Sequence, residues 1–104
     1  MLDELVKFAK KNHPGFAAFE DELVKRFFET LRETTLVSHR DGEIQGFAIY
    51  ANRPEGIYFF CIVGTKDRRA NLMTMLKNIR QFRKGKKIMW HDEARKLHIC
   101  RYRF

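Results

Sequence analysis

The seven-residue run from Ile57 to Val63 limits the fold of this chain more than any other segment does. Every residue in it is apolar or aromatic, and the turn-forming segment Arg53 to Gly56 precedes it. A run of this length without polar alternation is typical of a strand that is covered on both faces. It is far shorter than the roughly 20 residues that a membrane-spanning helix needs. The run therefore predicts the central β-strand of a sheet.

In the segments before this run, the apolar residues recur with the spacing of α-helices. Apolar residues recur at three-and-four spacing from Leu2 to Ala9, and the sequence Asn-His-Pro-Gly at 12–15 ends that pattern. A second amphipathic pattern runs from Phe16 to Leu31, with charged residues on its other sides. The sequence predicts a short first helix and a longer second one.

At Thr35 the spacing of apolar residues changes from the pattern of helices to that of β-strands. A β-branched and apolar stretch covers 35–39, the tight-turn dipeptide Asp41-Gly42 follows, and a second strand pattern covers 44–51. Together with the run at 57–63, these patterns predict a meander of three strands.

The part of the chain after Gly64 predicts one more helix and two more strands. Apolar residues share one side of a helix over 68–84, and Gly85 stands where helices commonly end. Strand patterns follow at 86–91 and 97–104, joined by a loop at 92–96. We therefore expect one domain over residues 1–104 of the α+β class, with α/β-like character. Its central sheet is mixed and mainly antiparallel, and its element order is α-α-β-β-β-α-β-β.

Length and composition suit one folded domain. The chain has 104 residues, of which 44% are hydrophobic and ten are Phe, so an apolar core can form. It starts Met-Leu-Asp-Glu, without a basic and then apolar leader, which predicts a soluble, cytoplasmic protein with no membrane partner.

Cys61 and Cys100 lie in apolar runs and are expected to be reduced, packed thiols. Burial in mid-strand favours a packing role for Cys61 over a nucleophilic one.

The charge is concentrated in one part of the chain. The net charge is +8, and residues 68–104 carry twelve Lys and Arg against two Asp and Glu, whereas residues 1–33 carry six against seven. A basic surplus of this kind favours phosphate-bearing or acidic partners.

The basic C-terminal residues are interleaved with Trp90, Tyr102 and Phe104, a composition that nucleic-acid-binding proteins use. In the last predicted strand the aromatic residues alternate with Arg101 and Arg103, which favours a core position for the rings. A solvated surface, an acidic protein partner and a nucleic acid therefore stay open. The candidate anion-binding residues are Arg80, Arg83, Lys84, Lys86, Lys87, Arg101 and Arg103, with Arg95 and Lys96 nearby.

No metal site is expected. Cys61, Cys100, His91 and His98 include no pair with the short spacing that zinc sites use. Because the final strand is an expected sheet edge, pairing with a second copy of the chain is another predicted interaction.

Two segments resemble the GNAT (GCN5-related N-acetyltransferase) family. The stretch Asp-Gly-Glu-Ile-Gln-Gly-Phe-Ala at 41–48 is similar to that family's second and third strands. The stretch at 58–63, followed by basic residues at 66–69, is similar to its fourth strand and cofactor loop. The resemblance covers roughly residues 2–90 as a shortened version of the fold, and it is typical of proteins that phages and mobile elements carry.

The resemblance implies a place for acetyl-CoA. In the family, the end of the fourth strand splays from its neighbour toward the pantetheine, and a glycine-containing turn at a helix N-terminus holds the pyrophosphate. By position, the cofactor residues would be Ile62, Val63, Arg68, Arg69 and Asn71. The loop lacks the family's glycines. If the turn begins at Arg68, Asn71 and Met73 stand in their places, and if it begins at Lys66, Arg69 and Asn71 do.

Two functions follow from these patterns. The first is a non-enzymatic or vestigial GNAT-like module whose basic C-terminal part binds an acidic protein or a nucleic acid. The alternative is a small acyl-CoA-dependent N-acetyltransferase, for which no catalytic residue is selected. Glu43, Tyr50, Tyr58 and His39 are all candidate bases for it.

Overall fold

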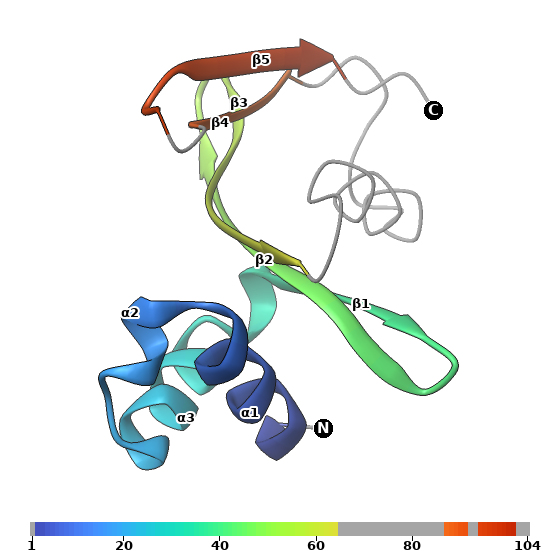
Figure 1. Ribbon diagram of the computed structural model, residues 1–104. Coiled ribbons are helices and arrows are strands. Elements are labelled where there is room, and N and C mark those ends of the chain that lie inside the picture. Colours follow the sequence, from blue (N-terminus) through green and yellow to red (C-terminus); the bar gives the residue numbers. More distant parts are fainter. Residues whose placement is uncertain (1, 65–86, 92–93, 102–104) are drawn as a thin grey trace.

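The computed structural model describes residues 2–64, 87–91 and 94–101. Within these ranges the helices gather at one end of the sheet and the last two strands lie at the other (Figure 1). The elements are α1 (Leu2–Asn12), α2 (Pro14–Ala17), α3 (Asp21–Thr30), the 3₁₀ turn η1 (Arg32–Thr34), β1 (Thr35–Arg40), β2 (Glu43–Arg53), β3 (Gly56–Gly64), β4 (Lys87–His91) and β5 (Leu97–Arg101).

The described strands form one sheet in the order β1-β2-β3-β4-β5, so the run at 57–63 is in the central strand. Three neighbouring pairs are antiparallel, and β3 and β4 are parallel. This arrangement confirms the α+β class with a mixed, mainly antiparallel sheet. A parallel pair needs a crossover connection, and the helix predicted over 68–84 lies outside the described residues.

The hairpin between β1 and β2 also agrees with its sequence. Asp41 and Gly42 have φ values of 54° and 79°, the left-handed pair that a tight two-residue turn requires. The neighbouring residues Arg40 and Glu43 pair across the two strands. The dipeptide therefore sets the register next to the turn, and an irregularity between Ser38 and His39 shifts the register farther along the hairpin.

The prediction of one helix from Phe16 to Leu31 is wrong, because the segment forms α2 and α3 with a break between them. Glu20, Asp21 and Glu22 stand at the break and begin α3. Acidic side chains are favourable at the positive end of a helix dipole, so they support a helix start rather than a helix interior. Two ion pairs, Lys10–Asp21 and Lys25–Asp3, link α3 back to α1.

The core forms two clusters on opposite sides of the sheet, and a β-bulge in β3 changes which side the following residues of that strand face. Tyr50 of β2 pairs with Phe59 and Ile49 pairs with Cys61, so Phe60 is an extra residue in the ladder. Before the bulge, Ile57 and Phe59 pack in one cluster, and after it Val63 packs in the other. We call them the open-face core (Leu36, Ala48, Tyr50, Ile57, Phe59 and Ile88) and the helix-face core (Leu5, Val6, Ala9, Val24, Phe28, Ile44, Phe47, Ile49 and Val63).

Candidate functional site

The end of β3 holds two of the residues that the GNAT resemblance assigns to the cofactor. Val63 is buried in the helix-face core, and Ile62 is half-buried against the open-face core. The parallel ladder between β3 and β4 ends at Phe59 and Trp90, whereas β3 continues to Gly64. The ladder stops there because β4 itself ends at His91. The other assigned residues, Arg68, Arg69 and Asn71, lie outside the described residues.

The basic residues are described only in part. Lys87 is exposed on β4, and Arg95 and Lys96 are exposed in the connection that leads to β5. Arg101 is the last residue of β5, and its side chain is outside the described part. The remaining candidates, Arg80, Arg83, Lys84, Lys86 and Arg103, also lie outside it.

The described basic residues border one face at the β4–β5 end of the sheet. Strand pairing joins Tyr58, Met89 and Ile99 across three neighbouring strands, so their side chains point to the same side. This side is opposite to the open-face core. We call it the hairpin face; its residues are Arg53, Tyr58, Lys87, Met89, His91, Leu97 and Ile99.

Polar groups on the hairpin face are joined to one another. The Tyr58 hydroxyl lies 2.6 Å from Nδ1 of His91, which is hydrogen-bond distance. The guanidinium carbon of Arg53 lies 4.3 Å from the centre of the Tyr58 ring, a cation–π contact. The face thus combines a cation, an aromatic ring and an imidazole from the ends of β2, β3 and β4.

Apolar side chains complete this face. Leu97 and Ile99 of β5 are 46% and 56% exposed. On the opposite side of the sheet, the rings of Trp90 and His98 stack with centroids 5.3 Å apart. The strand alternation was predicted from the sequence, but the contacts of Arg53 and His91 with Tyr58 were not.

The four candidate bases do not come together. His39 and Glu43 are exposed near the β1–β2 turn, and Tyr50 is buried in the open-face core with its hydroxyl donating to the Glu33 carbonyl at 3.3 Å. Tyr58 lies on the hairpin face. Within the described part of the chain, these four residues therefore do not form one site.

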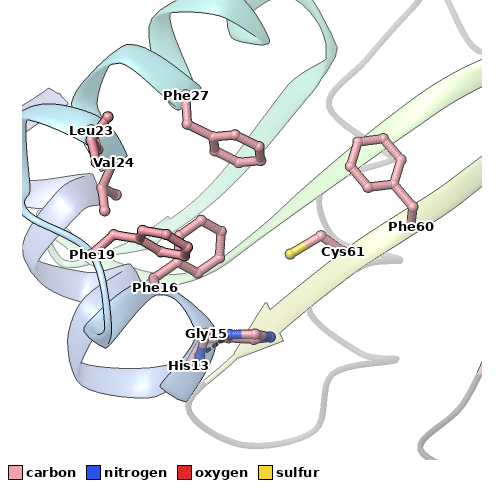
Figure 2. A pocket seen from close by; sticks show the side chains of 9 residues that line it. All are labelled: His13, Gly15, Phe16, Phe19, Leu23, Val24, Phe27, Phe60 and Cys61. Atoms are coloured by element: carbon pink, nitrogen blue, oxygen red, sulfur yellow. Dashed lines mark hydrogen bonds between the residues drawn. The ribbon is translucent and has the colours of Figure 1, made fainter.

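A second candidate site, which the sequence analysis missed, is an apolar pocket between the helices and β3. It has a volume of about 460 Å³. Figure 2 shows the Cys61 sulfur directed from β3 toward the Phe16 ring. The lining residues are His13, Gly15, Phe16, Phe19, Leu23, Val24, Phe27, Phe60 and Cys61.

This pocket corrects the expectation that Cys61 is buried in mid-strand. The residue is half-buried, and its side chain lines the pocket wall. The bulge at Phe60 is the physical reason, because it turns the following side chain to the helix side of the sheet. A simple alternation of side chains along β3 would have placed Cys61 with Phe59.

Metal ligands do not cluster in the described residues, which contain no group of three or more His, Cys, Asp or Glu that could hold a metal ion. Within the same ranges, no helix is long and apolar enough to cross a membrane. Comparisons of the chain with models of known protein families, with curated proteins and with solved structures find no match.

Proposed function

We propose that this chain is a non-enzymatic, GNAT-like module that binds a phosphate-bearing or acidic partner through its basic C-terminal part. The observation that carries the proposal is the hairpin face, where exposed Lys87 lies on the same side of the β4–β5 hairpin as the exposed apolar residues Leu97 and Ile99. The surplus of ten positive charges over residues 68–104 gives this end of the chain its attraction for anions.

The composition of the face suits a phosphate chain that carries bases. Lys87, Arg95 and Lys96 can neutralise phosphates, and releasing the counterions of those phosphates favours binding. The Arg53 guanidinium, packed over the Tyr58 ring, and the apolar side chains of β5 offer surface against which bases can pack. A cytoplasmic location would suit such partners.

Binding to a single-stranded oligonucleotide of about 15 nucleotides should weaken steeply with salt. Each phosphate contact contributes roughly 0.7 to the slope of log K against log salt for single strands. Changing Lys87, Arg95 and Lys96 together to Gln should therefore flatten that slope by about 2. Fluorescence anisotropy over a salt series measures it.

The matched control changes Lys7, Lys11 and Arg26 to Gln, which removes three exposed positive charges from the helices instead. This variant has the same net charge as the test variant and should keep the slope of the unaltered protein. Equal slopes for the two variants would show that net charge, and not the hairpin face, controls binding. Polyglutamate as a competitor distinguishes an acidic polypeptide from a phosphate-bearing partner.

One observation favours the alternative acyl-CoA-dependent N-acetyltransferase. β3 continues past its last pair with β4, and the GNAT resemblance places the pantetheine beside this end of the strand. If acetyl-CoA binds, a hundredfold excess over its Kd adds about 2.7 kcal/mol to the free energy of unfolding.

A thermal melt with and without millimolar acetyl-CoA tests this alternative. The proposed module predicts an unchanged Tm. A stabilisation of the size above would raise the Tm of a domain this long by about 10 °C, and that result would replace the binding module with the enzyme. Coenzyme A without the acetyl group is the control for recognition of the acyl part.

A further inference from the structure

We propose that the pocket between α2, α3 and β3 binds an uncharged apolar molecule that carries one hydrogen-bond acceptor, such as an aromatic ketone or ester. Its volume of about 460 Å³ falls within the range of natural small-molecule sites, roughly 300–1,000 Å³. The site shares no residue with the hairpin face, so the inference is independent of the proposed function.

Exposed apolar surface is concentrated at this pocket. Six large hydrophobic side chains in the described residues are exposed, and four of them line the pocket with exposed fractions between 38% and 57%. These four are Phe19, Leu23, Phe27 and Phe60. Apolar surface gathered in one hollow indicates a binding site, because covering it removes that surface from water.

The aromatic walls favour a flat apolar ligand. Phe16 is held by edge contacts with Phe27 at 5.5 Å and with His13 at 5.2 Å, measured between ring centroids. In Figure 2 the Phe27 and Phe60 rings stand at one end of the pocket and the His13 imidazole at the other. A ring system lying between these ends would meet ring faces and edges along its length.

His13 supplies a polar group to this apolar site. Its Nδ1 accepts a hydrogen bond from the Gly15 amide at 3.1 Å, so in the neutral ring the proton is on Nε2. In the described residues no acceptor is hydrogen-bonded to that Nε2–H group. The ring is also held by close packing, since a Cβ at position 15 would lie 2.9 Å from His13 Cε1. The imidazole is therefore positioned as a hydrogen-bond donor.

The residues that line the pocket also exclude charged ligands. None of the nine lining residues is an Asp, Glu, Lys or Arg. A carboxylate or ammonium entering the pocket would lose hydration without gaining an ion pair, whereas a carbonyl needs only the one donor. The preferred ligand is thus neutral, apolar and an acceptor.

The test compares two neutral isosteres, 2-acetylnaphthalene and 2-isopropenylnaphthalene, which differ in having C=O or C=CH₂ at the same place. Equilibrium dialysis should show that the protein binds the ketone about 3–10-fold more tightly, the ratio expected for one net hydrogen bond. His13→Phe keeps a ring at the position and removes the donor, so it should reduce this ratio to about 1 or below, because the carbonyl would then be buried without a hydrogen-bond partner. Equal affinities in the unaltered protein would overturn the proposal.

A second pair of variants tests the location without depending on His13. Leu23→Glu places a charge in the pocket and should weaken both compounds at least tenfold. Ala17→Glu adds the same charge at an exposed position outside the lining and should leave both affinities unchanged. Binding that survives Leu23→Glu, or no binding at all, would contradict the proposal. A protein that is dimeric in sedimentation, becomes monomeric in Leu23→Glu and binds neither compound would assign the pocket to a second copy instead.

Discussion

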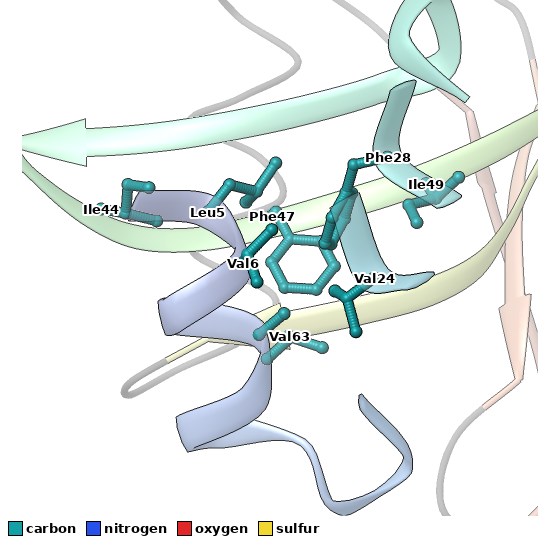
Figure 3. Packing of buried hydrophobic residues seen from close by; sticks show 9 residues of the cluster. Leu5, Val6, Val24, Phe28, Ile44, Phe47, Ile49 and Val63 are labelled. Atoms are coloured by element: carbon teal, nitrogen blue, oxygen red, sulfur yellow. The ribbon is translucent and has the colours of Figure 1, made fainter. Parts of the chain in front are cut away.

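Replacing Phe47 with alanine should lower the free energy of unfolding by about 3–5 kcal/mol. The Phe47 side chain is fully buried at the centre of the helix-face core, where Figure 3 shows it between side chains from α1, α3 and β3. Its ring meets Phe8, Phe16 and Phe28 at centroid distances of 5.3–6.2 Å. Truncation would leave a cavity between the helices and the sheet, and urea denaturation measures the loss.

The matched control is Phe60→Ala, which removes the same atoms from the bulge in β3. Phe60 is 47% exposed, so its ring gives up much less apolar contact. We expect a cost of about 1 kcal/mol or less. Similar losses for the two variants would mean that the helices do not pack on β2 as described.

Gly56→Ala should destabilise the fold by about 2–4 kcal/mol, because it combines steric overlap with backbone strain. Gly56 begins β3 with φ of 154°, and a Cβ there would lie 2.4 Å from the Lys87 carbonyl oxygen. That oxygen belongs to the backbone of β4 and cannot move away as a flexible side chain would. The substitution should therefore loosen β4 from β3 as well as lower the midpoint of urea unfolding.

Gly42→Ala is the control for this variant. Gly42 also has a positive φ, of 79°, but no atom lies within 4 Å of the position its Cβ would take. Only the conformational cost remains, about 1–2 kcal/mol. If Gly42→Ala costs as much as Gly56→Ala, the close parallel packing of β4 on β3 is not present in solution. Amide hydrogen exchange in β4 distinguishes local loosening from a global effect.

The local patterns of this sequence predicted most of the described fold. The Asp41-Gly42 turn needs a left-handed pair of residues, and these two types tolerate it, so the hairpin was predictable. The run at 57–63 was correctly placed in the central strand. The second helix was predicted wrongly, because the spacing of its apolar residues continues through the break. Only the acidic residues at 20–22 mark the start of α3.

The candidate sites were harder to predict because they depend on contacts between distant elements. The bulge at Phe60 follows from how β3 pairs with β2, and it decides that Cys61 lines the pocket. Likewise, Tyr58 and His91 are 33 residues apart and meet only because β3 and β4 are parallel neighbours. The surplus of basic residues could be counted from the sequence, but the arrangement of the hairpin face beside it could not be predicted.

The most direct test of the proposed function is to record amide chemical shifts of the isotope-labelled protein while adding a single-stranded oligonucleotide at low salt. The account predicts that shifts concentrate in β4, in the 94–96 segment and in β5, with Tyr58 and Arg53 included and α1 to α3 unaffected. Shifts centred on the helices, or none up to millimolar oligonucleotide, would contradict it.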